Sequence, residues 1–366
     1  MRFTLQREVF LKALTQVINV VERRHTLPVL SNLLVQIQDG RMSLTATDME
    51  VEMISRIAVE DSENGEITIP ARKMYDLVRA LPDGSRITVK VNQERVTITS
   101  GKSKFALSTL PSLDFPSIDE IDATESLEIP ESALREMIDR TAFAMANQDV
   151  RFYLNGLLFD LRTNSLRCVA TDGHRLALCE HQLDTPQATP RQIILPRKGV
   201  QELQRLLEGG DRVLKMQIGR GHIRVEREDL CFTSKLIDGK FPDYEGVMAI
   251  GADQSIRADR EVLRSALQRA AIVANDKYKG VRLEINDGKV HISSNNPDQD
   301  EANEELEAET TINGLEMGFN VVYLLDALTS LRDDQIVIKV KDANSSALVQ
   351  EASNERCRHV VMPLRL

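Results

Sequence analysis

The sequence predicts an α+β protein made of three tandem copies of one domain, each with two helices packed on antiparallel sheet. The first observation is a recurring polar turn, which stands at Thr47-Asp48, again at Thr171-Asp172, and more faintly at Asn295. Successive occurrences are separated by about a third of the 366 residues. One period that spans the whole chain indicates internal repetition.

The second observation is a pair of amphipathic helices in each third. The segment Pro70–Leu81 returns as Pro196–Leu207 and more faintly as Asn320–Leu328. Ahead of it, each third has an opening helix with apolar residues three or four positions apart, which is the spacing of one helix face. These apolar residues are Phe10, Leu14, Val17 and Val21, then Leu134 and Ile138, then Leu263 and Leu267.

The third observation is the alternation of apolar and polar residues between the helices, which is typical of strands. It is clearest in Ile87–Val91, Val96–Thr99 and Ile336–Val340. Gly219 and Gly221 flank one residue between two such runs and predict a hairpin tip rather than a phosphate-binding loop. Further turns are expected at Asp39-Gly40, Asp83-Gly84, Asp238-Gly239 and Asp287-Gly288.

Two segments rich in Pro and Asp predict where the copies end. They are Asp114–Glu120 and Asp238–Tyr244. We therefore expect domains at residues 1–120, 121–247 and 248–366, called copies one, two and three below. Domains of about 120 residues are long enough to bury a core without disulfides or metals.

Composition favours a cytoplasmic protein, with 42% hydrophobic and 28% charged residues. The longest run without charge, His25 to Gln38, is too short and too polar to span a membrane. No basic start followed by an apolar stretch is present, so we expect no secretory signal. The four cysteines contain no CxxC pair, and reduced, packed thiols are the expected state.

The formal net charge of −10 argues against nucleic acid as a partner, but the charges are unevenly distributed. Acidic residues concentrate in segments between the helices. Basic residues gather on the helices, which favours a shared basic face, although solvated helix surfaces with mixed charges are the alternative. The basic helix residues are Arg72, Lys73 and Arg79, then Arg197, Lys198 and Arg205, then Arg260, Arg264 and Arg269.

Two further charge blocks are complementary and predict a homodimer. Basic residues surround apolar ones near the end of copy one, and acidic residues follow an apolar helix in copy three. If copy one of one chain meets copy three of another, the contact closes a two-fold ring. Ordinary charges at hairpin tips remain the alternative. The residues are Arg95, Lys102, Lys104, Phe105 and Leu107 in copy one, and Ile272, Val273, Asp298, Asp300 and Glu301 in copy three.

Asp172 and His174 are the candidates for catalysis, because residues two apart on a strand share a face and could form a hydrolase's acid-base dyad. No GxSxG, Walker or HExxH motif accompanies them. Copy one keeps the acid as Asp48 but has Glu50 in place of the histidine. A structural turn explains the repeated residue better, so we expect no catalytic residues.

His174, Cys179 and His181 form the one candidate metal cluster. On a continuous strand, His174 faces away from the other two residues. The sequence therefore predicts no metal and no cofactor.

The residues resemble a known family, the bacterial sliding clamps, which are the beta subunits of DNA polymerase III. The resemblance runs along the whole chain. It rests on the threefold period and on the segments Asn147–Gly156, Thr171–Leu176, Phe232–Leu236 and Val360–Leu366.

This resemblance implies three DNA-clamp domains per chain and a head-to-tail homodimer that forms a six-domain ring with helices lining the hole. The ring is expected to encircle double-stranded DNA without reading its sequence and to act as a processivity factor in replication. The chain would be a non-catalytic subunit of the polymerase III holoenzyme, which is a nucleotidyltransferase.

The implied protein partners are the DNA polymerase III catalytic subunit, the ATP-dependent clamp loader, other polymerases and repair factors, all through short peptide motifs. A non-encircling repeat scaffold that binds only proteins is the alternative.

The resemblance also implies two sets of contact residues. Phe152 and Tyr153 fall in the DNA-binding set, although core packing at the start of a strand is an alternative for both, and many relatives have tyrosine in place of Phe152. The full DNA-binding set is Arg24, Arg72, Ile121, Gln148, Phe152 and Tyr153.

The second set forms an apolar cleft between copies two and three that would bind partner peptides. Gly246 and Asn344, near its rim, replace bulkier residues of some relatives. The cleft residues are Leu154, Thr171, Gly173, His174, Arg175, Leu176, Pro242, Val247, Asn320, Tyr323, Ser346, Val360, Val361, Met362, Pro363 and Arg365.

Overall fold

The structure, a computed structural model, describes residues 1–22, 27–118, 121–187, 189–248, 251 and 254–365. It consists of two compact units, each treated separately below. Unit 1 comprises Met1–Ser132 and Gln201–Leu236, and unit 2 comprises Ala133–Val200 and Ile237–Leu366. Among the described residues, no helix combines the length and the apolar composition needed to cross a membrane.

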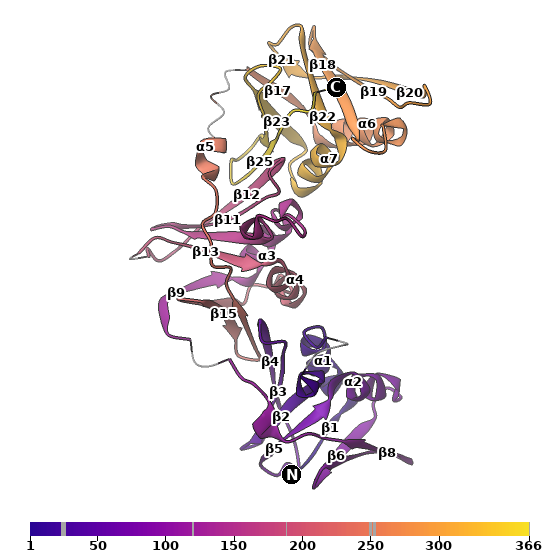
Figure 1. The fold of residues 1–366 in the computed structure, drawn as a ribbon, viewed down its shortest axis with the longest axis vertical. Coiled ribbons are helices and arrows are strands. Elements are labelled where there is room, and N and C mark those ends of the chain that lie inside the picture. Colours follow the sequence, from indigo (N-terminus) through magenta and orange to yellow (C-terminus); the bar gives the residue numbers. More distant parts are fainter. Residues whose placement is uncertain (23–26, 119–120, 188, 249–250, 252–253, 366) are drawn as a thin grey trace. The chain divides into compact units, whose positions relative to one another are not determined.

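Unit 1 contains two antiparallel sheets, with strand orders β1-β6-β7-β8 and β5-β2-β3-β4-β16-β15-β14-β9 (Figure 1). Its strands are β1 (Arg2–Gln6), β2 (Asn32–Gln38), β3 (Arg41–Thr47), β4 (Val51–Ala58), β5 (Gly65–Pro70), β6 (Arg86–Asn92), β7 (Arg95–Ser100), β8 (Ser103–Ser108), β9 (Ala123–Pro130), β14 (Val213–Gly219), β15 (His222–Arg227) and β16 (Leu230–Lys235). Its helices are α1 (Arg7–Val17) and α2 (Ala71–Ala80), with short 3-10 helices at Pro28–Ser31 and Ser112–Asp114. Helices α3 (Glu131–Asp139) and α4 (Arg197–Leu206) run across the points where the chain passes between the units.

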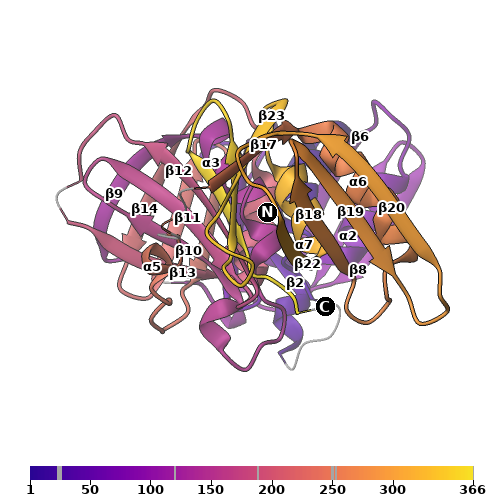
Figure 2. The same cartoon turned by 90° about the horizontal axis from the view of Figure 1, so that it is seen from above.

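Unit 2 also contains two sheets, ordered β13-β10-β11-β12-β25-β24-β23-β17-β21 and β20-β19-β18-β22. Figure 2 shows β18, β19 and β20 side by side. The strands are β10 (Gly156–Leu161), β11 (Ser165–Thr171), β12 (Arg175–Gln182), β13 (Arg191–Pro196), β17 (Gln254–Asp259), β18 (Gly280–Asn286), β19 (Lys289–Asn295), β20 (Glu301–Glu307), β21 (Glu309–Thr310), β22 (Leu315–Asn320), β23 (Gln335–Val340), β24 (Ala347–Glu351) and β25 (Cys357–Val361). The helices are α5 (Tyr244–Met248), α6 (Arg260–Val273) and α7 (Val321–Ser330), with 3-10 helices at Ala142–Ala144 and Phe152–Leu154.

The sheets confirm the predicted threefold α+β repeat. Each copy supplies two sets of four strands, to one of which copy three adds the two-residue strand β21. The outer strands β4, β12 and β20 occupy equivalent positions in copies one, two and three. The outer strands β8, β16 and β25 form a second equivalent set. The long sheets arise because strands of successive copies pair edge to edge, β4 with β16 in unit 1 and β12 with β25 in unit 2.

The predicted apolar helix faces are buried. Phe10, Leu14 and Val17 are at most 1% exposed on α1, and Val21 is buried just beyond the helix end. Apolar burial of this kind drives the helices onto the sheets. The corresponding buried residues of the other copies are Leu134 and Ile138 on α3 and Leu263 and Leu267 on α6.

Side-chain caps fix the starts of two helices in copy three. Asp259 accepts a hydrogen bond from the Val262 N–H at the start of α6, and Asn320 accepts one from the Val322 N–H at the start of α7. These bonds satisfy N–H groups that have no partner inside a helix. The two helices lie side by side in Figure 1.

The predicted turns at Asp39-Gly40 and Asp287-Gly288 are confirmed as hairpin turns. Both residues of the Asp39-Gly40 and Asp287-Gly288 turns have positive φ, which a two-residue hairpin turn of the primed type requires. Gly219 and Gly221 lie at the tip between β14 and β15, as predicted. The predicted strands are also present, within β6, β7 and β23.

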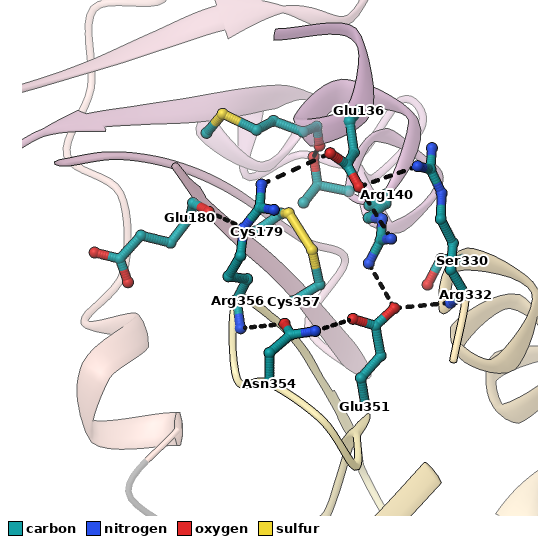
Figure 3. Close-up of a disulfide and its surroundings, with 12 residues drawn as sticks. Glu136, Arg140, Cys179, Glu180, Ser330, Arg332, Glu351, Asn354, Arg356 and Cys357 are labelled. Atoms are coloured by element: carbon teal, nitrogen blue, oxygen red, sulfur yellow. Dashed lines mark hydrogen bonds and ion pairs between the residues drawn. A yellow bond between two sulfur atoms is a disulfide. The ribbon is translucent and has the colours of Figure 1, made fainter. Parts of the chain in front are cut away.

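The prediction of four reduced thiols is wrong for one pair. Cys179 and Cys357 face each other across β12 and β25 and form a disulfide, although they are 178 residues apart in sequence (Figure 3). Only the pairing of these two strands brings the sulfur atoms together, so spacing along the sequence gave no sign of it. Cys168 and Cys231 are free and buried.

A charge network with buried Arg140 and Glu351 at its centre lies beside this disulfide (Figure 3). Arg140, which is 6% exposed, binds Glu351 at 2.8 Å and Glu136 at 3.0 Å. Arg332 and Arg356 also reach the Glu136 carboxylate. The network ties α3 of copy two to the strand β24 of copy three, so the joint between these copies is held by charge as well as by strand pairing.

The disulfide predicts a thiol count. We expect the denatured protein to show about two reactive thiols per chain without reductant and about four after reduction, because only Cys168 and Cys231 are free. Titration with an aromatic disulfide reagent in guanidinium measures both numbers. The variant Cys357→Ser serves as the control and should show about three thiols before reduction; four thiols in unreduced wild-type protein would refute the disulfide.

Candidate functional site

A cavity of about 190 Å³ in unit 2 contains most of the predicted peptide-cleft residues. We call it the unit-2 cleft. Its lining comes from the 3-10 helix at Phe152–Leu154, the turn between β11 and β12, the segment that leads into α5, and the end of β25. The lining residues are Arg151, Tyr153, Leu154, Thr171, Gly173, Arg175, Leu176, Phe241, Pro242, Tyr244, Val247, Val360 and Met362.

The floor of the unit-2 cleft is part of the hydrophobic core. Leu176, Phe241, Tyr244 and Val360 are each at most 4% exposed and belong to one buried cluster, against which Tyr153 also packs. A floor of this kind is preformed, so a ligand's apolar groups can be buried without first ordering the site.

The turn between β11 and β12 shapes one wall. Asp172 Oδ1 accepts hydrogen bonds from the N–H groups of His174 (2.9 Å) and Arg175 (3.1 Å). Thr171 Oγ1 accepts from the Gly173 N–H and donates to the Arg175 carbonyl. Gly173 has φ of +89°, and a Cβ there would lie 2.9 Å from the Arg151 guanidinium. Only glycine fits this position without displacing Arg151.

The equivalent turn of copy one makes the same bonds. Asp48 Oδ1 accepts from the N–H groups of Glu50 and Val51, and Thr47 Oγ1 accepts from Met49 N–H and donates to the Val51 carbonyl. The repeated Thr-Asp pair is therefore explained by turn structure.

The Asp172 and His174 side chains are both engaged in structural contacts. The second Asp172 oxygen accepts from Arg175 Nε at 3.1 Å, and the His174 ring stacks on Tyr323 with centroids 6.4 Å apart. These contacts account for both residues without the acid-base dyad.

Arg175 connects the cleft wall to its surroundings. Its guanidinium pairs with Asp172 and Asp326, donates to the Phe143 carbonyl at 2.9 Å, and lies over the Tyr323 ring at 4.6 Å. Burial raises the pKa of the Tyr323 hydroxyl, and the nearby Asp172 charge raises it further. Arg175 thus holds the turn against α7 through charge and ring contacts together.

Tyr244, which is part of the floor, is held in place by its hydroxyl. This hydroxyl donates to Asp160 and accepts from Arg162 at 3.0 Å. Burial raises the pKa of the Tyr244 hydroxyl, as does its bond to Asp160. The ring is therefore neutral at physiological pH and presents an apolar face to the cleft.

Arg151 lies at the rim of the cleft. It binds the Asp149 carboxylate through Nε and Nη2, and these hydrogen bonds hold the pKa of Asp149 down at about 2. It also donates to the Asp172 carbonyl at 3.3 Å. The positive charge of Arg151 at the rim is thus largely balanced by the Asp149 carboxylate.

Several predicted cleft residues lie outside the cavity. His174 and Tyr323 flank it as a stacked pair, Asn320 caps α7, and Arg365 lines a different cavity of unit 2 with Tyr278. The remaining predicted residues outside the lining are Ser346, Val361 and Pro363. The chain end is anchored by backbone bonds from Met362 to His174 and from Leu364 to Gly318.

Sequence reasoning missed Arg151, Phe241 and Tyr244 as lining residues and assigned Tyr153 to DNA alone. In the sequence, the segment Phe241-Pro242-Asp243-Tyr244 predicts a domain end. The signal for Phe241 and Tyr244 was the presence of two aromatic residues within four positions, because aromatic side chains are commonly buried.

The predicted DNA-binding residues are divided between the units. Arg24 lies outside the described residues. In unit 1, Arg72 is half-buried and donates to the Val21 carbonyl at 3.0 Å, and Ile121 lines a cavity. In unit 2, Gln148 has φ of +58° and Phe152 is 55% exposed. Tyr153 packs edge-on against Phe152 and also lines the unit-2 cleft.

Ion pairs balance much of the predicted basic helical charge. Arg79 pairs with Asp76 at 3.2 Å and Arg269 with Glu304 at 2.7 Å, and Arg205 and Arg264 pair with Glu202 and Glu261 on their own helices. Arg72 and its counterpart Arg197 instead donate to backbone carbonyls, of Val21 and of Met145 and Ala146. Pairing of this kind leaves a weak positive field rather than a strongly basic surface.

The residues predicted to form a dimer interface lie on two sheet edges. Lys104, Phe105 and Leu107 are on β8, the last strand of its sheet in unit 1, beside Arg95 on β7 and Lys102 in the β7–β8 turn. Glu301 is on β20, the last strand of its sheet in unit 2, and Asp298 and Asp300 precede it. Ile272 and Val273 end the adjacent helix α6, with Ile272 81% exposed.

Within the described ranges, no group of three or more His, Cys, Asp or Glu side chains is placed to hold a metal ion. Cys179, one of the three residues considered for a metal, is bonded to Cys357.

Family profiles match the chain in three consecutive segments. The N-terminal, central and C-terminal domains of the DNA polymerase III beta subunit match residues 1–119, 128–243 and 247–365. The chain belongs to the family of DNA polymerase III beta subunits. This confirms the resemblance found in the sequence.

Relatives named beta sliding clamp match over the full length of both chains. The proteins of Pseudomonas aeruginosa, Pseudomonas putida and Escherichia coli are 49%, 48% and 45% identical to this chain. Among solved structures, the Pseudomonas aeruginosa clamp bound to griselimycin matches with a TM-score of 0.98 at 49% identity, covering all of both chains. The Caulobacter crescentus beta subunit matches with a TM-score of 0.94 at 34% identity, also over both full lengths.

Arg175 provides a test of the site's architecture. We expect Arg175→Met to lower the free energy of unfolding by about 2 to 4 kcal/mol, because Asp172 and the Phe143 carbonyl lose a charged donor while partly buried. The matched control is Arg135→Met, whose exposed pair with Asp139 should contribute under about 0.5 kcal/mol. Urea unfolding at one protein concentration compares the two, and equal losses would contradict the role given to Arg175.

Proposed function

We propose that the chain works as a DNA sliding clamp: a processivity factor that encircles duplex DNA and tethers the replicative DNA polymerase III and other replication and repair proteins. It acts as a non-catalytic subunit of that holoenzyme in the cytoplasm. The observation that carries the proposal is the match, over full length, to proteins named beta sliding clamp.

The strand topology supports a head-to-tail dimer. Within each chain, β4 of copy one pairs with β16 of copy two, and β12 of copy two pairs with β25 of copy three. Of the two equivalent sets of outer strands, this leaves β8 of copy one and β20 of copy three as sheet edges. A third joint of the same kind can form only between chains, and two such joints close a ring of six copies.

Charge and apolar surface favour this third joint. Lys102 directly precedes β8 and Lys104 lies on it, whereas Asp298 and Asp300 precede β20 and Glu301 begins it. Complementary charges orient the partners, and the exposed Ile272 gives an apolar side chain to bury. Pairing β8 with β20 also removes two exposed edges that would otherwise promote aggregation.

The same threefold repeat leads us to place the domain boundaries near residues 120 and 247.

Sliding requires weak and sequence-independent contact with DNA. A net charge of −10, with helix arginines largely paired, keeps the overall attraction to phosphates low. We assign the contacts to Arg24, Arg72, Ile121, Gln148, Phe152 and Tyr153. Exposed Phe152 supplies an aromatic face on which a base or sugar can stack.

The unit-2 cleft is the proposed docking site for partner peptides from the polymerase III catalytic subunit, the ATP-dependent clamp loader and other polymerases and repair factors. Its floor is apolar and preformed, and Met362 offers an adaptable contact that suits several ligands.

Topology of the DNA decides between a clamp and a protein-only scaffold. After loading with a cognate clamp loader and ATP onto a nicked circle, we expect the protein to co-elute with DNA in gel filtration and to be lost once the circle is linearised, because a ring slides off free ends. Equal retention on both forms, with an active loader, would contradict encirclement and favour the scaffold.

Deletion of the C-terminal residues tests the docking site. We expect deletion of Met362–Leu366 to abolish binding of a partner peptide while leaving the dimer intact, because Met362 lines the cleft and lies outside the proposed interface. Fluorescence polarisation measures the affinity, and gel filtration checks the dimer. Unchanged affinity would show that peptides bind elsewhere.

A further inference from the structure

A second cavity, of about 350 Å³, lies in unit 1, and Ile121 is the one lining residue to which the function proposed above gives a role. We call it the unit-1 cleft. It is formed by the turn between β3 and β4, the segment around residues 116–122, the hairpin tip between β14 and β15, and the end of β16. Its lining residues are Thr47, Met49, Pro116, Ser117, Ile118, Ile121, Asp122, Gly219, Arg220, Gly221, His222 and Lys235.

The unit-1 cleft is the structural counterpart of the unit-2 cleft. The Lys235 N–H donates to the Glu50 carbonyl at 2.8 Å, and the Met362 N–H donates to the His174 carbonyl at 3.0 Å. Lys235 follows the pairing of β16 with β4, as Met362 follows the pairing of β25 with β12. Both residues line their clefts. The same joint between copies therefore builds the same cavity twice.

The other walls correspond as well. Thr47 and Met49 occupy the turn positions of Thr171 and Gly173, with the hydrogen bonds described above. Proline, a large apolar residue and a β-branched residue follow at the same spacing in both copies. These are Pro116, Ile118 and Ile121 in the unit-1 cleft, and Pro242, Tyr244 and Val247 in the unit-2 cleft.

Two local contacts hold the apolar part of the unit-1 cleft in place. The buried Glu52 carboxylate accepts a hydrogen bond from the Ile118 N–H at 3.0 Å and holds this segment in place. A Cβ at Gly219 would lie 2.6 Å from Ile121 Cγ2, so glycine is needed for Ile121 to sit where it does. Met49, 42% exposed, adds an adaptable apolar wall.

The difference between the two clefts is charge. Lys235 stands in place of Met362, and His222, which pairs with Lys235 across the hairpin, stands in place of Ser346. Arg220 adds a second cation at the hairpin tip, whereas burial and the nearby Lys235 charge lower the pKa of His222. Among the described lining residues, Asp122 is the one carboxylate. Asp119 and Glu120 lie outside the described residues. A ligand that combines apolar groups with carboxylates complements such a lining.

We propose that the unit-1 cleft is a second peptide-binding site, which takes a short extended segment carrying apolar side chains next to carboxylates. Apolar side chains of the segment contact Met49, Ile118 and Ile121, while its carboxylates face Arg220, His222 and Lys235. The inference uses the proposed role of the unit-2 cleft as its precedent but needs neither the ring nor DNA.

The probe is a fluorescein-labelled peptide of sequence Asp-Leu-Phe-Asp-Leu-Phe, with one Phe replaced by benzoylphenylalanine for photocrosslinking. We expect crosslinks at residues 116–118, 121, 122, 219–222 and 235, in addition to any in the unit-2 cleft. Replacing both Asp by Asn in the peptide should weaken binding to the unit-1 cleft at least tenfold, and raising the salt concentration should weaken it as well.

Variants separate this site from general attraction to positive charge. Lys235→Glu should remove the unit-1 crosslinks and leave those in the unit-2 cleft. The matched reversal Lys215→Glu changes an exposed residue of β14 that does not line the cavity, and it should change neither set of crosslinks. Crosslinks confined to the unit-2 cleft, or equal losses in Lys235→Glu and Lys215→Glu, would overturn the proposal. A failure of DNA encirclement would leave all of these outcomes unchanged, so the two proposals fail separately.

Discussion

Edge-to-edge pairing of antiparallel strands is the interaction on which the rest of the structure depends. Each copy ends in outer strands whose N–H and C=O groups need partners, and the next copy supplies them: β4 with β16 and β12 with β25. A repeat that can satisfy its edges only through another repeat forms a continuous series of joints. With three copies in a chain, two joints are internal and the third requires a second chain.

The same joints create the binding surfaces. A turn closed by Thr and Asp side chains approaches the end of the neighbouring copy's last strand, and the linker between copies covers the gap with proline and a large apolar residue. The unit-2 cleft has an apolar chain end at this place, whereas the unit-1 cleft has a basic rim. One architecture thus offers two sites that differ mainly in charge, which is the property that most readily separates ligands.

Sequence patterns that act over a few residues predicted the fold. The contacts that shape the site join residues far apart in sequence, and these were not predictable. The period, the buried faces of Leu134, Ile138, Leu263 and Leu267, and the Asp-Gly turns were predictable because helix spacing and turn chemistry act over a few residues. The disulfide between Cys179 and Cys357 and the bond from Tyr244 to Asp160 join residues far apart in sequence. Their contacts depend on strand register, for which the sequence offers no local signal.

Hydrogen exchange measured by mass spectrometry tests the proposed third joint most directly. If β8 pairs with β20 of a second chain, amides in residues 103–108 and 301–307 should exchange slowly in the wild-type protein and quickly in Ile272→Asp, which places a charge at the interface. Val262→Asp, at the other end of the same helix and 52% exposed, should exchange like wild type. Fast exchange of both strands in the wild-type protein at micromolar concentration would contradict the ring.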